Sequence, residues 1–159
     1  MLRISKLADY ATVILVFLAK HTEGVCNAKE IAKHTAIAVP TVSKLLKVLA
    51  GAGLLQSQRG ATGGYRLACS AQDISVGQII EVIEGDSGLT ECSVDDGLCA
   101  LEQVCEIRGN WQLINHAIQA ALDSVSVADL AKPKLAACDI NVSQIKAFAS
   151  QEVKHGKDK

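Results

Sequence analysis

The segment from residue 40 to residue 67 constrains the fold most, because a helical repeat leads directly into a glycine-rich turn. Pro40 suits the first turn of a helix, where its missing amide hydrogen costs nothing. Apolar residues then recur at the three- and four-residue spacing of a buried helix face, at Val42, Leu45, Leu46 and Leu49. Gly51 and Gly53 predict the end of this helix.

A β-hairpin is expected next. Two short strand-like segments, residues 54–57 and 65–67, flank the sequence QRGATGG of residues 58–64. A glycine-rich segment between two such runs predicts a hairpin tip.

Two helices are expected ahead of the Pro40 helix. Ser5 can cap a helix ending near residues 21–24, and Asn27 with Glu30 resembles a capping box that opens a helix to about His34. The predicted buried face of the first consists of Leu7, Ala11, Ile14, Leu15 and Leu18. Three helices followed by a hairpin form a winged helix-turn-helix, so we expect a mainly α fold with a small β-hairpin wing.

The polar face of the Pro40 helix suits DNA. It carries short hydroxyls and long cations, which fit base edges and phosphates in a major groove. At the hairpin, glycine permits close backbone approach and arginine can enter a narrow minor groove or reach phosphate. We expect DNA contacts from Thr41, Ser43, Lys44, Lys47, Arg59, Gly60 and Arg66. The alternative is an ordinary solvated face on a helical core.

Charge is distributed unevenly along the chain. Residues 1–68 hold nine Lys/Arg and three Asp/Glu, a net charge of +6, whereas residues 69–106 hold nine Asp/Glu and no Lys or Arg. Residues 107–159 carry +2, which brings the total to −1. The N-terminal part can therefore approach phosphate, and the middle part repels it.

The second half of the chain predicts two further helices and an irregular segment. Ser75 with Gln78 opens a helix that Gly85 ends, with Val76, Ile79, Ile80 and Ile83 facing inward. Residues 86–106 show no helical period. A long helix follows from about residue 107, and Pro133 stops it. Its predicted dimerisation seam is Trp111, Ile114, Ile118, Ala121 and Val125.

These patterns divide the chain into four parts. We expect a DNA-binding domain over residues 1–84, a cysteine-bearing loop over 85–106, a dimerisation helix over 107–131 and a partly disordered tail over 132–159. No stretch reaches the roughly 18 apolar residues of a membrane span, and no signal-peptide pattern is present, so we expect a cytoplasmic protein. Structural disulfides are rare there, so clustered cysteines favour metal or redox chemistry.

Three of the six cysteines are clustered. Cys92, Cys99 and Cys105 form a C-x6-C-x5-C pattern, unlike the C-x2-C pairs of zinc ribbons and common ferredoxins. Three thiolates on a short loop can converge on one inorganic cluster. Free thiols and a zinc site are the alternatives. We interpret the isolated Cys26, Cys69 and Cys138 as small buried apolar residues.

Four stretches give the chain a resemblance to a known family. These are MLRISKLADY at residues 1–10, PTVSKLL at 40–46, QRGATGGYRL at 58–67 and the three clustered cysteines. Together they resemble the Rrf2 family of transcription regulators over residues 1 to about 131. The stretches TECS at 90–93 and NWQLIN at 110–115, with PTVSK, are most similar to the proteobacterial regulators of the SUF iron–sulfur assembly operon.

The resemblance implies a homodimer joined by the long helix, a palindromic double-stranded DNA operator and an iron–sulfur cluster on Cys92, Cys99 and Cys105. One branch of the family adds a histidine three residues after the third cysteine, where this chain has Arg108, which stays protonated and cannot ligate iron. Another branch takes an acidic ligand from the partner's first helix, at the position of Asp9. We therefore favour Asp9 of the partner subunit and a [4Fe–4S] cluster over a [2Fe–2S] cluster. His34 is a further candidate ligand.

The resulting hypothesis is a repressor of iron–sulfur assembly genes that senses cluster supply. A sensor of nitric oxide or thiol oxidation is the alternative within the same family. A small electron carrier or iron–sulfur enzyme is the alternative outside it, but the chain has no GxGxxG or P-loop fingerprint and no convincing catalytic constellation. We therefore expect no enzymatic activity.

Overall fold

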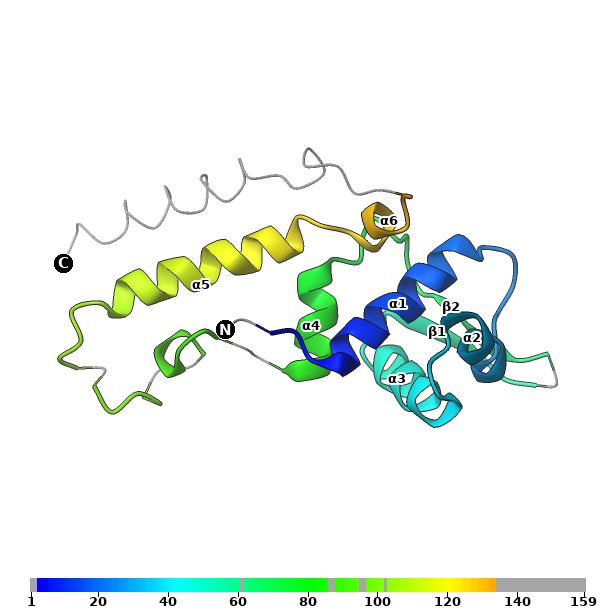
Figure 1. Cartoon of the computed structure of the whole chain (residues 1–159), viewed down its shortest axis with the longest axis horizontal. Coiled ribbons are helices and arrows are strands. Elements are labelled where there is room, and N and C mark those ends of the chain that lie inside the picture. The colour runs from blue at the N-terminus through cyan, green and yellow to red at the C-terminus, as the bar shows by residue number, and fades with distance from the viewer. Residues whose placement is uncertain (1–2, 61, 86–87, 95–96, 102, 134–159) are drawn as a thin grey trace.

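The computed structural model describes residues 3–60, 62–85, 88–94, 97–101 and 103–133. A winged-helix body holds three helices, a two-stranded hairpin and a fourth helix, and a long helix extends away from it (Figure 1). In chain order the elements are α1 (Lys6–Lys20), α2 (Ala28–Thr35), α3 (Val39–Gly51), β1 (Leu55–Gln58), β2 (Gly64–Leu67), α4 (Val76–Glu84), the 3-10 turn η1 (Glu91–Ser93), α5 (Arg108–Asp123) and α6 (Val127–Leu130).

The first two helices begin where their capping residues predict, and α3 begins at Val39, next to Pro40. The Ser5 hydroxyl accepts a hydrogen bond from the Ala8 amide at 3.2 Å, and the Asn27 side chain accepts from the amides of Lys29 and Glu30 at 3.0 Å. Pro40 occupies the first turn of α3. These side chains satisfy amides that a helix start leaves unbonded, which confirms the sequence-based boundaries.

The buried faces of these helices form one core. The predicted α3 face, Val42, Leu45, Leu46 and Leu49, is completely buried, as are four of the five residues predicted for α1. The exception is Leu7, which is 38% exposed, while its neighbour Ala8 is buried. The prediction for Leu7 was wrong because the contact face of α1 passes through the small Ala8 and Ala11, which permit close approach of the neighbouring helices.

The wing is an antiparallel hairpin in which Leu55 pairs with Leu67 and Gln58 with Gly64. The segment before α2 extends it through two hydrogen bonds between Cys26 and Tyr65, at 3.0 and 2.9 Å. A side chain at Gly64 would lie within 2.7 Å of the Cys26 carbonyl, so glycine is required there. Cys26 is buried as predicted, and burial raises the pKa of its thiol.

The other two isolated cysteines differ from Cys26. Cys69 is exposed, so its prediction as a buried apolar residue was wrong: it follows β2, beyond the last strand residue that packs on the core. Cys138 lies outside the described residues.

The predicted dimerisation helix does not continue to residue 131. It ends at Asp123, and Ser126 and Asp129 form a capping box that starts the separate helix α6. Hydrogen bonds from Ser126, and from Lys132 above all, lower the pKa of Asp129 to about 2. The prediction missed this break because the S-x-x-D pattern lies inside an otherwise continuous apolar repeat.

The segment after α5 belongs to the winged-helix body. Val127 is fully buried in the core, α6 contacts α1, and the Val127 amide donates to the Ile74 carbonyl at 2.9 Å. Val125 is also buried, and its carbonyl accepts from the Val76 amide at 2.9 Å. Val125 therefore lies outside α5, where the helical repeat had placed it, and its part in a dimer stays a prediction.

We predict that Val127→Ala destabilises the protein by about 2 kcal/mol, because it removes buried methyl groups and leaves a cavity. Urea unfolding at fixed protein concentration measures the change. The matched control is Val104→Ala, since Val104 is 77% exposed and should change the unfolding free energy little. Equal effects of the two substitutions would show that α6 does not belong to the core.

Candidate DNA-binding and cluster-binding sites

The outer face of α3 carries the predicted base- and phosphate-contacting residues. Lys44 and Lys47 are exposed, and Thr41 and Ser43 are half-buried at the edge of the same face. The opposite face of α3 packs into the core through Leu45 and Leu46. The structure therefore supports two mobile cations and two short hydroxyls on a helix whose backbone is held in place.

Arg59 and Gly60 lie exposed at the tip of the wing. Gly60 has a φ of 119°, a conformation that L-residues rarely adopt, and its carbonyl accepts from the Gly63 amide at 3.0 Å. The turn is closed by these two glycines, which leaves the Arg59 side chain on its outside.

Arg66 has a partner that the sequence did not reveal. Its Nε and Nη2 both donate to Oε1 of Gln56, at 3.0 and 2.8 Å, across the hairpin. The two residues are opposite each other in the strand register. The sequence does contain a signal for this pair. The length of the turn sets the register of a hairpin, and the register places residues 56 and 66 opposite each other.

The clustered cysteines lie in the segment that joins α4 to α5. Cys92 is buried in η1, where its Sγ lies 3.2 Å from the Thr90 hydroxyl. Cys99 and Cys105 are half-buried. The turn η1, which the sequence analysis missed, is held against α5 because Gln112 donates to the Cys92 carbonyl at 3.3 Å.

The three thiols are not brought together with other ligands in this conformation. Among the described residues, no group of three or more His, Cys, Asp or Glu side chains is close enough to hold a metal ion. Asp9 is exposed on α1. His34 stacks with Phe17 at the end of α2, with 5.2 Å between ring centroids. Any shared centre therefore requires movement of the loop or a second chain.

The cysteine-bearing loop also carries several exposed apolar side chains. The most exposed are Leu98, Leu101, Val104 and Ile107, each more than half exposed. Four such residues within ten positions are unusual on a surface that contacts only water. The loop therefore presents a surface suited to an apolar neighbour.

The long helix α5 also lacks a partner on one side. None of its residues, Arg108 to Asp123, is buried, and Trp111, Leu113 and Ile114 are more than a third exposed. Ile118 and Ala121, the next seam residues, are half-buried. This helix begins just after the cysteine-bearing loop and runs back toward the body, where it ends at Asp123 (Figure 1).

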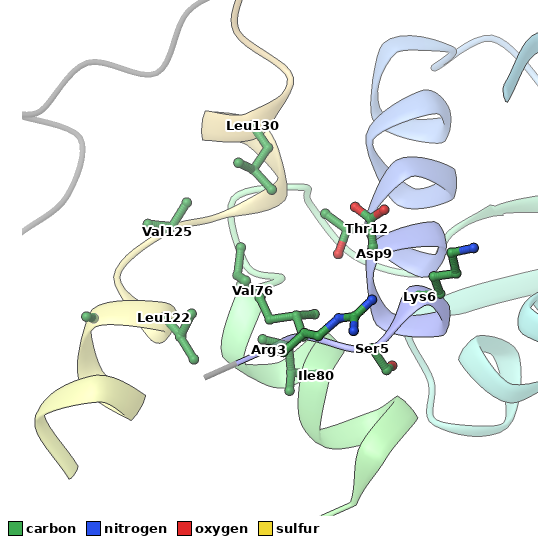
Figure 2. A pocket seen from close by; sticks show the side chains of 12 residues that line it. Arg3, Ser5, Lys6, Asp9, Thr12, Val76, Ile80, Leu122, Val125 and Leu130 are labelled. Atoms are coloured by element: carbon green, nitrogen blue, oxygen red, sulfur yellow. The ribbon is translucent and has the colours of Figure 1, made fainter. Parts of the chain in front are cut away.

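A groove of 560 Å³ runs beside Asp9. Its walls come from residues 3–12, from α4, from the end of α5, from Val125 and from α6, and Asp9 and Thr12 lie on the α1 side of it (Figure 2). Apolar side chains form most of the lining, chiefly Ile4, Val76, Ile80, Leu122, Val125 and Leu130. Arg3, Lys6 and Asp9 supply charge at the same groove.

A helix-turn-helix with an exposed basic recognition helix and a glycine-rich wing defines a winged-helix DNA-binding protein. Residues 4–133 match the model of the Rrf2 family, described as an iron-dependent transcriptional regulator. The chain belongs to the Rrf2 family of transcriptional regulators.

Individual relatives agree with this assignment. The chain is 31% identical over 150 residues to protein rrf2 of Nitratidesulfovibrio vulgaris, covering 94% of this chain and 99% of that protein. The structure of CymR, the global cysteine regulator of B. subtilis, is similar with a TM-score of 0.66 and 36% identity, over 82% of this chain and 97% of CymR. The structure of T. potens IscR is similar with a TM-score of 0.61 and 33% identity, over 81% and 85%.

The descriptions of the family and of CymR both denote regulators, which is consistent with the expectation from sequence. Within the described part of the chain, no helix is both long and apolar enough to cross a membrane.

We predict that Arg59→Ala weakens DNA binding by about 1–3 kcal/mol, because it removes a cation that we expect to contact the DNA. The probe is a duplex selected by the wild-type protein from a random-sequence pool, and fluorescence anisotropy gives the Kd. Lys20→Ala, which removes one positive charge at the end of α1, is the control. If both variants bind equally well, the wing does not contact DNA.

Proposed function

We propose that this chain is a homodimeric repressor of iron–sulfur assembly genes whose affinity for a palindromic operator depends on an iron–sulfur cluster. The observation that carries the proposal is the placement of Cys92, Cys99 and Cys105 between the DNA-binding body and the exposed helix α5. The resemblance to IscR, and the iron dependence in the family description, support it.

The donor chemistry of the loop fits such a cluster. Thiolates are the usual ligands of iron–sulfur clusters, and three of them lie within fourteen residues. The Thr90 hydroxyl beside Cys92 is a suitable hydrogen-bond donor to a coordinated sulfur. The exposed Leu98, Leu101 and Val104 would shield a cluster from water once the loop closes. Cys99 and Cys105 would have to move toward Cys92, which the irregular backbone permits.

A bound cluster supplies a covalent link among the thiols that oxidants and iron shortage can break. Residues of this chain would transmit a change in the loop to helix α5. Cys105 lies three residues before α5, and Gln112 ties that helix to the Cys92 backbone. Drawing the loop together would therefore position α5, and with it the spacing of two recognition helices in a dimer.

The dimer is proposed from two complementary surfaces. Helix α5 exposes apolar side chains, above all Trp111 and Ile114, that contact with a second chain would bury. The groove beside Asp9 is an open, largely apolar surface. In a two-fold dimer, α5 of each chain would pack in the groove of the other chain, so both apolar surfaces would be buried in both chains. The partner's α5 would bring its preceding loop toward Asp9.

We therefore assign Asp9 of the partner subunit as the fourth ligand and favour a [4Fe–4S] over a [2Fe–2S] cluster. A carboxylate is an exchangeable ligand compared with a thiolate, which suits a sensor whose cluster must be lost readily. Asp9 is exposed and lines the groove proposed for the second chain.

We predict that Cys99→Ala abolishes the cluster, because two thiolates cannot retain it, while the fold and dimer remain. Protein purified without oxygen is assayed for iron, sulfide, visible absorbance and DNA affinity. Cys69→Ala, an exposed cysteine outside the loop, is the control and should keep the cluster. Colourless, iron-free wild-type protein, even after reconstitution, would refute the proposal, as would equal DNA affinity with and without the cluster.

We predict that Asp9→Asn leaves a cluster that a chelator removes several-fold faster than in wild type, since the amide is a weaker ligand. Asp73→Asn, at an exposed carboxylate between β2 and α4, should change nothing. Heterodimers of one Asp9→Asn chain and one Cys99→Ala chain test the geometry. They hold one complete site if Asp9 acts across the dimer, and none if it acts within its own chain.

A further inference from the structure

Two histidines from different helices meet on the surface of the winged-helix body. His21 follows the last residue of α1, and His34 lies in the last turn of α2. Both pack against Phe17, whose ring centroid is 4.0 Å from that of His21 and 5.2 Å from that of His34. The two imidazole centroids are 5.9 Å apart. The proposed cluster site does not use this arrangement.

A backbone hydrogen bond fixes the chemical form of His21. Its Nδ1 lies 2.8 Å from the Phe17 carbonyl oxygen, which can only accept. Nδ1 therefore carries the hydrogen in the neutral ring, and the lone pair resides on Nε2. Histidines that bind metals commonly donate their second nitrogen to a carbonyl in this way, which sets the tautomer and raises ligand basicity.

The separation of the rings fits a shared ion. A metal–nitrogen bond of about 2.0–2.1 Å places each ring centroid roughly 3.2 Å from the metal, so two imidazoles at a tetrahedral angle stand roughly 5.2 Å apart. The observed 5.9 Å differs by less than 1 Å from this tetrahedral spacing, and by roughly 1.4 Å from the roughly 4.5 Å expected at the 90° angle of square-planar or octahedral nickel. The planes are inclined by 48°, so the two imidazoles are not stacked on each other.

The surroundings allow binding at low cost. Both imidazoles are exposed, so neither must be desolvated before it coordinates an ion, and water can complete the coordination shell. Glu30, also exposed, lies one turn before His34 on α2, while Lys20 and Lys33 are the nearest cations in sequence. Because no third His, Cys, Asp or Glu among the described residues joins the pair, we expect moderate affinity.

We propose that His21 and His34 form a binding site for a late first-row divalent cation, of the Co²⁺, Ni²⁺, Cu²⁺ and Zn²⁺ class, separate from the cysteine loop. Imidazole is a preferred ligand of these ions. His34 lies two residues before Ala36, whose φ of 58° forms the turn into α3. An ion at this site therefore links the end of α1 to the helix-turn-helix and stabilises their contact.

The test is isothermal titration of NiCl₂ into full-length, untagged protein prepared without oxygen and loaded with its cluster, so that the loop thiols are occupied. We expect one saturable nickel per chain and an affinity loss of at least about tenfold in His21→Gln or His34→Gln. His116→Gln, an exposed histidine on α5, is the control and should bind as wild type. Thermal unfolding should show stabilisation by nickel only where both histidines are present.

Unchanged nickel affinity in His21→Gln and His34→Gln would overturn the inference. The contacts among the rings of Phe17, His21 and His34 would then only shield apolar surface from water. Equal losses in His116→Gln would show nonspecific binding, and losses that follow Cys99→Ala would place the ion at the loop. Cluster content and DNA affinity are measured on the same samples. These should not change in His21→Gln, so failure of this inference is distinguishable from failure of the proposed function.

Discussion

The burial of one face of α1 is the contact on which the rest of the structure depends. Ala8, Ala11, Ile14, Leu15 and Leu18 are all buried, and α1 packs against α2, α3, α4, α6 and β2. The two alanines permit close approach and the larger residues fill the remaining space, which is how interiors reach high density. The recognition helix, the wing and the returning segment after α5 are therefore positioned by a single element.

The body and the α5 arm are stabilised differently. The body has a continuous apolar core, whereas α5 has no buried residue and contacts the chain chiefly through α4 and η1. An amphipathic helix of this kind gains most of its stability from packing of its apolar face, which is the packing that the proposed dimer would supply. The acidic, cysteine-bearing loop joins α4 of the body to the start of α5, so the proposed cluster would act on this same helix.

Local signals made the body largely predictable. Ser5, Asn27 and Ser75 each cap the helix that their position predicts, and the period of Val42, Leu45, Leu46 and Leu49 gave the buried face of α3 correctly. The hairpin strands were placed within a residue because glycine positions limit where the turn can lie. Prediction failed at Leu7 and Val125, where helical spacing alone cannot tell which neighbour the helix meets.

The sequence by itself determined the helix starts, the hairpin and the set of three loop cysteines, because capping, turn chemistry and residue identity are local properties. Tertiary structure alone decided that residues 125–130 return to the core and that His34 lies beside His21 rather than among the thiols. Each of these contacts joins residues that are distant in the chain or on separate elements. No periodicity encodes such a contact, because it depends on how the α1 core orients every element packed around it.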